Sequence, residues 1–175
     1  EIFLTKDGET TTEWKAEDQV VCGDAMPDCS GTFGINMDYR GIFLNMSFYY
    51  QFGGQTYNQT LVDRVENADV GLNVDKRIYN AVWKKPGDRV DFSYNPYRLT
   101  KPSSRFVQDL NELRLSSLNV GYDFRHCAFL KKSRLQQLKA SFYMDDVFRA
   151  STVKTERGLT YPFARTFSFS LQATF

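Results

Sequence analysis

The last ten residues of the chain, Thr166-Phe167-Ser168-Phe169-Ser170-Leu171-Gln172-Ala173-Thr174-Phe175, alternate strictly between polar and apolar side chains. Successive side chains of a β-strand point to opposite faces, so this pattern predicts a strand with one apolar and one polar face. The composition agrees, because 15% of the residues are aromatic, with 15 Phe and 10 Tyr. Aromatic side chains favour pleated, half-buried surfaces. The chain is therefore expected to be mainly β-structure.

The same alternation recurs in four earlier segments. Strands are predicted near residues 31–40, 42–52, 112–124, 138–148 and 164–175. Arg40-Gly41 separates the first two and predicts a tight hairpin turn. In the third segment Leu113 and Leu115 have the opposite parity to Leu118, so we expect a bulge near Ser116-Ser117.

The connections between these strands alternate in length. Residues 1–30 are polar and turn-rich, with a small hairpin expected around Asp7-Gly8. A long segment, 53–111, contains helix-like stretches near 58–67 and 75–83, whereas the connection 125–137 is short. Short turns on one side and long loops on the other are typical of transmembrane barrels, whose long loops are extracellular. The loops 1–30 and 53–111 are therefore predicted to be extracellular.

The polar faces favour a membrane barrel over a soluble sandwich. In the second strand Asn45, Ser47, Tyr49 and Gln51 share one face, which carries no Lys or Glu. A solvent-facing sheet would normally use such charges for solubility. An apolar stripe of about nine residues, tilted by about 45°, spans roughly 20 Å, close to the roughly 25 Å band of such barrels. A soluble carbohydrate-binding β-sandwich and a passive porin remain alternatives.

Five strands are too few for a complete barrel. The smallest transmembrane barrels have about eight strands, and open sheet edges are not viable in lipid. We therefore predict an all-β chain that supplies the C-terminal strands, about five, of a large antiparallel transmembrane β-barrel in the bacterial outer membrane. Residues 31–175 would form this barrel segment, with the C-terminus in the periplasm. The other strands would lie outside this sequence.

Three stretches, in this order along the chain, carry a family resemblance. They are Phe52-Gly53-Gly54-Gln55-Thr56-Tyr57-Asn58, Asp109-Leu110-Asn111-Glu112-Leu113-Arg114-Leu115-Ser116-Ser117-Leu118-Asn119-Val120-Gly121-Tyr122 and Tyr161-Pro162-Phe163-Ala164-Arg165-Thr166-Phe167-Ser168-Phe169-Ser170-Leu171. Together they resemble the C-terminal part of the SusC/RagA-like TonB-dependent transporters. Val120 stands where the family pattern has a leucine, which keeps the position apolar.

The resemblance implies a function and a set of partners. It implies part of an importer of glycans or peptides, energised through TonB and working with a SusD-like surface lipoprotein. The other partners implied are the rest of the barrel, its plug and the outer-membrane lipid. The plug and the TonB-binding segment are expected to lie outside this chain. A final strand bearing Phe167, Phe169, Leu171 and Phe175 resembles the signal read by the barrel-insertion machinery.

Enzyme and cofactor motifs are not found in the sequence. It has no Gly-x-Ser-x-Gly, no phosphate loop and no metal motif, and its one histidine, His126, falls in a predicted periplasmic turn. We therefore expect no enzyme activity, cofactor or metal. With 22 Lys plus Arg against 21 Asp plus Glu, the net charge of +1 gives no reason to expect nucleic acid as a partner.

The candidate site residues are few. Asn45, Ser47, Tyr49 and Gln51 are candidates for a substrate path, although plain lumen wall is the simpler interpretation. Trp83 lies in the long outer loop, where aromatic rings stack on sugars or pack against other loops. Cys22 and Cys29 share one polar loop and are compatible either with a small disulfide in an oxidising compartment or with two free thiols.

Overall fold

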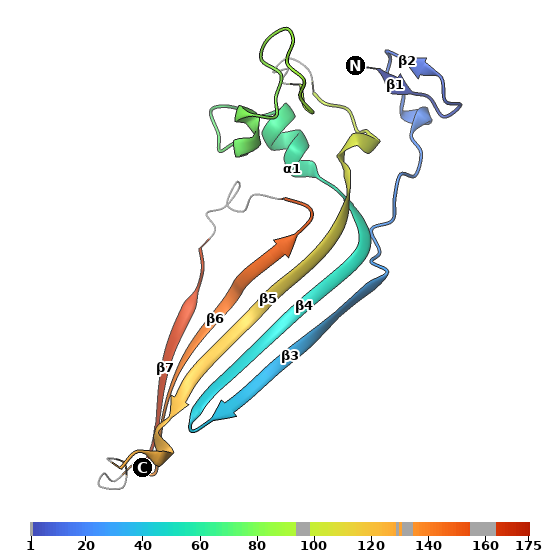
Figure 1. Cartoon of the computed structure of the whole chain (residues 1–175). Coiled ribbons are helices and arrows are strands. Elements are labelled where there is room, and N and C mark those ends of the chain that lie inside the picture. Colours follow the sequence, from blue (N-terminus) through green and yellow to red (C-terminus); the bar gives the residue numbers. More distant parts are fainter. Residues whose placement is uncertain (1, 94–98, 129, 131–134, 155–163) are drawn as a thin grey trace. The chain divides into compact units, whose positions relative to one another are not determined.

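The computed structural model describes residues 2–93, 99–128, 130, 135–154 and 164–175. The chain divides into two compact units. Unit 1 comprises residues 1–26, 54–109 and 153–162, and unit 2 comprises residues 27–53, 110–152 and 163–175. Figure 1 labels the strands and the helix α1.

Unit 2 is built on one antiparallel sheet. Its strands follow the order β3-β4-β5-β6-β7, so each strand pairs with its neighbour in sequence (Figure 1). The bounds are β3 Cys29–Tyr39, β4 Ile42–Tyr57, β5 Val107–Asp123, β6 Gln137–Ser151 and β7 Phe167–Thr174. The prediction of five antiparallel strands is confirmed.

The turn between β3 and β4 shows why the first hairpin forms. Tyr39 pairs with Ile42, so only Arg40 and Gly41 connect the strands. Both have positive φ, 50° and 92°. Two successive positive φ values define the tight turn whose twist matches that of paired strands, and glycine adopts the second at no steric cost.

The predicted irregularity in the third strand is present, but the extra residue lies on its partner. Leu115 pairs with Phe148 and Ser117 with Asp145, so two steps on β5 match three on β6. Asp146 of β6 has φ 49°, as expected where a bulge inserts a residue. The parity of leucines on β5 located the bulge but could not assign it to a strand, because it reads only one of the two.

β4 and β5 are longer than the sequence pattern indicated. The pair Gly53-Gly54 was expected to end the second strand, yet β4 continues to Tyr57. Gly53 has φ 85°, and its N–H donates to Asn111 Oδ1 at 3.0 Å, which ties the chain down where the regular ladder breaks. Correspondingly, β5 begins at Val107, five residues before the predicted start.

The two faces of the sheet differ as predicted. Cross-strand pairs such as Phe33 with Phe48 and Phe142 with Phe169 bring the apolar stripes of neighbouring strands together. Apolar side chains on this face remain largely exposed, for example Met37 at 57% and Phe169 at 72%. Soluble monomers rarely expose so wide an apolar surface. Among the described residues, no helix is long and apolar enough to cross a membrane.

Unit 1 contains short elements. A two-stranded sheet, β1 Phe3–Leu4 with β2 Thr10–Thr11, confirms the small hairpin expected around Asp7-Gly8. Among the described residues, the helical elements are η1 Ala16–Asp18, α1 Gln59–Leu61, η2 Val62–Glu66, η3 Lys76–Tyr79 and η4 Ser104–Phe106 in unit 1, and η5 Phe124–His126 in unit 2.

The long segment of unit 1 has a hydrophobic core of its own. The core comprises Leu61, Val62, Val65, Val82 and Phe106, with Ile78 and Phe92 packed against it. Asn58 opens the helix formed by α1 and η2, because its side chain accepts a hydrogen bond from the Leu61 N–H. The helix-like stretches predicted near 58–67 and 75–83 are present as α1 with η2 and as η3, but the hydrophobic core that joins them was not predicted.

Charged groups are also buried in unit 1. Glu66 is 1% exposed and receives the Arg105 guanidinium at 2.7 Å. The Thr100 hydroxyl donates to the same carboxylate at 2.9 Å, and the Ser93 N–H donates to it at 3.3 Å. A buried carboxylate is tolerated only with such partners. This network therefore fixes segments far apart in the sequence.

Asp75 gives unit 1 a predicted pH dependence. Burial alone would raise the pKa of Asp75, but hydrogen bonds and charge from Arg77 outweigh it and lower the pKa below 3.8. A carboxyl with a depressed pKa stabilises the fold above its unfolded pKa, and that stability is lost as the pH falls through the folded pKa. Unit 1 should therefore open more readily below pH 3.8.

Hydrogen exchange of the full-length protein, corrected for the intrinsic rate at each pH, measures this opening. Asp75→Asn is the control, because an amide does not titrate, and it should flatten the profile for peptides covering residues 75–79. An unchanged profile in Asp75→Asn would contradict the assignment.

Candidate functional site

The four predicted substrate-path residues of β4 share one face of the sheet. Asn45, Ser47, Tyr49 and Gln51 pair with Asn36, Gly34, Thr32 and Ser30 of β3. The Tyr49 hydroxyl donates to Gln51 Oε1 at 2.6 Å. This polar face is opposite the apolar stripe, so both the alternation and the parity predicted for these residues hold in the structure.

A charged cluster on the same sheet was missed by the sequence reasoning. Glu112 of β5 is 6% exposed and accepts from Arg149 of β6 at 2.6 Å. Arg114 lies farther from that carboxylate, at 3.8 Å, and its guanidinium carbon is 5.2 Å from the centre of the Tyr49 ring. Part of this cluster could have been predicted from the sequence. Glu112 and Arg114 have opposite charges and lie two residues apart on one strand, so their side chains point to the same face. Only the fold shows that Arg149 joins them.

A polar hollow lies near the end of the sheet that carries the Arg40-Gly41 turn. It is a cavity of about 440 Å³ whose lining includes Asp38 of β3, Asn45 of β4 and Ser170 of β7. Because both edge strands contribute, the sheet curves around its polar side. Asp123 closes this end, accepting from Arg125 at 2.8 Å and from Gln137 at 2.8 Å. These bonds hold the start of the connection after β5.

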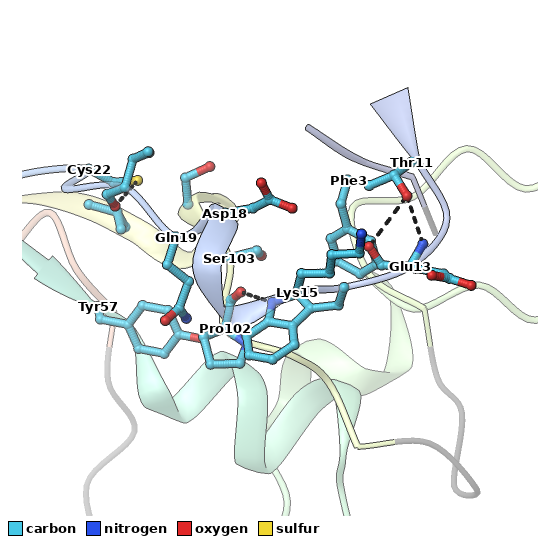
Figure 2. A pocket seen from close by; sticks show the side chains of 14 residues that line it. Phe3, Thr11, Glu13, Lys15, Asp18, Gln19, Cys22, Tyr57, Pro102 and Ser103 are labelled. Carbon is cyan, nitrogen blue, oxygen red and sulfur yellow. Dashed lines mark hydrogen bonds between the residues drawn. The ribbon is translucent and has the colours of Figure 1, made fainter. Parts of the chain in front are cut away.

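Unit 1 contains a separate cavity of about 350 Å³, shown in Figure 2. The aromatic side chains Phe3, Trp14 and Tyr57 line it together with Pro102 and several polar groups. Trp14 Nε1 donates to the Pro102 carbonyl at 3.1 Å, and the Lys101 ammonium is 5.4 Å from the indole ring centre. Sequence reasoning did not find this site, because its walls come from segments about ninety residues apart.

The remaining site predictions have mixed outcomes. Trp83 belongs to unit 1, whereas the four β4 residues belong to unit 2, and Trp83 is 47% exposed. Cys22 and Cys29 are free thiols in the structure, so the disulfide alternative does not hold there. Instead the Cys22 thiol donates to the Val20 carbonyl at 3.2 Å, while Cys29 is the first residue of β3.

No catalytic constellation is found in the part of the chain that the structure describes. Groups of three or more His, Cys, Asp or Glu residues able to hold a metal ion do not occur among these residues. His126 ends η5, a short turn after β5. The arrangement offers hydrogen bonding and aromatic contact rather than a reacting centre.

Comparison with known proteins identifies a relative that aligns with the whole chain. The whole chain aligns with TonB-dependent receptor P3 of Formosa agariphila (strain DSM 15362 / KCTC 12365 / LMG 23005 / KMM 3901 / M-2Alg 35-1) at 26% identity over 196 residues. The chain is a TonB-dependent receptor homologue. It spans about a fifth of the relatives it matches, 19% of this receptor's length. No family model matches the chain.

Solved structures confirm the architecture of this TonB-dependent receptor homologue. The RagAB peptide importer in its open-open state superposes with a TM-score of 0.70 over 99% of this chain and 20% of that one, at 16% identity. Its closed-closed state gives 0.67 at 17% identity, over 99% of this chain and 20% of that one. A third structure, of the RagAB peptide transporter, gives 0.68 at 18% identity, over 98% of this chain and 20% of that one.

These matches confirm the SusC/RagA-like resemblance predicted from the sequence. The fold of the TonB-dependent receptor homologue corresponds to about a fifth of the RagAB chain that it superposes on, 20% of its length. The relatives found are a TonB-dependent receptor and, among solved structures, a peptide importer.

Proposed function

We propose that the TonB-dependent receptor homologue forms part of the barrel wall and outer loops of an importer of glycans or peptides. The observation that carries this proposal is the five-stranded sheet of unit 2, with its exposed apolar face and uncharged polar stripe on β4. Its superposition on the RagAB peptide importer supports the barrel. Lipid would cover the apolar face, and the polar face would line the lumen.

The proposed orientation follows from the connections. The Arg40-Gly41 turn joins β3 to β4 within two residues, and η5 lies at the same end of the sheet as that turn, since the Asp123 N–H donates to the Gly41 carbonyl at 2.7 Å. Short turns of such barrels lie in the periplasm. The C-terminus would then be periplasmic, and residues 1–30 and 53–111 would be extracellular.

The two edge strands of the sheet indicate where further barrel strands would pair. β3 and β7 are the two edge strands. An unpaired edge in lipid leaves backbone groups without hydrogen bonds, so both edges would pair with other strands of the full protein. Phe167, Phe169, Leu171 and Phe175 would act as the insertion signal at one of them. A SusD-like lipoprotein, the plug and the TonB complex complete the proposed assembly.

The alternatives fit less well. A soluble sandwich packs a second sheet on the apolar face, at about 10 Å. The described residues of unit 2 instead form a single sheet with that face exposed. A passive porin would have the same kind of barrel wall, but uptake through it would not need energy from TonB.

Uptake in living cells tests the proposal. Strains with and without the gene, each with TonB intact or deleted, are supplied with labelled oligosaccharides and peptides. We expect uptake of at least one cargo that needs both the gene and TonB. Uptake that needs the gene but is unaffected by TonB loss would indicate a porin, and a gene product found in the soluble fraction would refute the barrel.

A further inference from the structure

The cavity of unit 1 has an aromatic wall that is fixed by the fold itself. Trp14 is half-buried, with Nε1 bonded to the Pro102 carbonyl at 3.1 Å and Lys101 near its ring at 5.4 Å. The indole donor and the ring position are thus set by the protein. Tyr57 and Phe3 line the same cavity (Figure 2). A preset ring surface binds a flat apolar patch with little loss of conformational freedom.

Polar side chains on the same cavity are uncommitted. Glu13, Lys15 and Gln19 line it and are exposed. Within the described part of the chain, none of these three side chains makes a hydrogen bond or an ion pair. They offer a carboxylate acceptor, an ammonium donor and an amide that does both. Groups that already stabilise the fold, such as the Thr11 hydroxyl bonded by the Glu13 N–H at 3.1 Å, are distinct from them.

The charge and the volume of the cavity limit the class of ligand that it can bind. The charged lining residues Glu13, Lys15 and Asp18 carry a net charge of −1, which the Lys101 ammonium beside the Trp14 ring offsets. The cavity therefore has no strong preference for an ionic ligand. The volume of about 350 Å³ lies at the lower end of ligand pockets, roughly 300–1,000 Å³. The cavity is therefore sized for one ring-like unit rather than for a long segment.

We propose that this cavity binds one uncharged sugar residue of the cargo. One face of a sugar ring carries C–H groups that pack on an aromatic ring, here Trp14. Its hydroxyls both donate and accept, which matches the mixed set Glu13, Lys15 and Gln19. The inference rests on the proposed import function and deepens it, because it selects glycan over peptide at a named site.

The test uses the full-length receptor, purified with any lipoprotein that accompanies it, on an array of neutral oligosaccharides and a parallel array of short peptides. Wild type should bind neutral oligosaccharides. Glu13→Ala and Gln19→Ala should each weaken that binding about tenfold, the effect of losing one ligand hydrogen bond of roughly 1.4 kcal/mol. Trp14→Ala should weaken it more, with the loss of the ring surface.

Glu17→Ala is the matched control, since Glu17 is exposed in η1 and does not line the cavity. Its affinity should equal that of wild type. The Glu13 and Gln19 variants keep the test valid if Trp14→Ala misfolds, because neither side chain supports the fold. Oligosaccharide affinity unchanged in both variants, binding to peptides alone, or binding to neither array would overturn the proposal.

The uptake assay separates this inference from the function on which it rests. TonB-dependent uptake that persists while Glu13→Ala and Gln19→Ala bind as wild type would overturn the sugar site and keep the importer. Loss of TonB dependence would overturn the importer itself.

Discussion

Replacing Phe48 with arginine will remove most of the folded receptor from the outer membrane. Phe48 lies in the middle of β4, on the apolar face, with its ring stacked on Phe33 at 4.8 Å between centroids. An arginine facing lipid near the middle of a barrel costs about 2–4 kcal/mol, falling towards the interfaces. Loss of the stacked pair adds about 1 kcal/mol. The heat-modifiable folded band of the full-length protein in outer-membrane fractions measures the effect.

Ser47→Arg is the matched control for that substitution. Ser47 is the neighbouring residue on the polar face, and its cross-strand partner is Gly34, which leaves room for a long side chain. The protein should assemble almost as well as wild type. Equal loss with Ser47→Arg, or normal assembly with Phe48→Arg, would show that the two faces are assigned wrongly.

Replacing Arg105 with methionine will open the long segment 53–111 locally. Glu66 is 1% exposed and, among the described residues, would retain Thr100 and Ser93 as hydrogen-bond donors. Removing one partner of a buried ion pair costs about 3–5 kcal/mol, and the lower end applies because the Arg105 side chain is 41% exposed. The Arg105 guanidinium carbon lies 4.7 Å from the centre of the Phe106 ring, and the long methionine side chain can fill part of that space. Hydrogen exchange in peptides covering residues 61–66 should accelerate about a hundredfold.

Two further variants establish the cause. Glu66→Gln combined with Arg105→Met should restore most of the protection, since no charge is then left buried. Arg89→Met, at an exposed position of the same unit, should change nothing. If the double variant exchanges as fast as Arg105→Met alone, the effect comes from lost packing and the electrostatic explanation fails.

The pocket beside Trp14 and the polar face of the sheet would serve different steps of import. The charged cluster of Glu112, Arg114 and Arg149 belongs to unit 2 and is held by strand pairing, so it is a rigid feature of the wall. The Trp14 pocket belongs to unit 1, whose core is small and whose elements are short. A rigid barrel wall is suited to passage of the cargo, whereas a pocket carried on loops is suited to its first capture.

The amino-acid sequence alone determined the strands, the short turn and the two faces of the sheet. Each of these depends on local geometry: side chains alternate with a period of two, and Arg40-Gly41 accepts the positive φ values of a tight turn. The pattern from Phe167 to Phe175 therefore identified a strand and a face without knowledge of its partners. The bulge near Ser117 was also visible, although its extra residue, at Asp146, was not.

The tertiary structure decided the features that join distant segments. The core around Phe106, the burial of Glu66 against Arg105 and the contact of Trp14 with Pro102 all join residues far apart in the chain. A local period carries no information about such pairs, because they depend on how the loop closes on itself. The alternating pattern thus predicted the strands of the barrel wall, whereas the candidate sugar site depends on long-range packing.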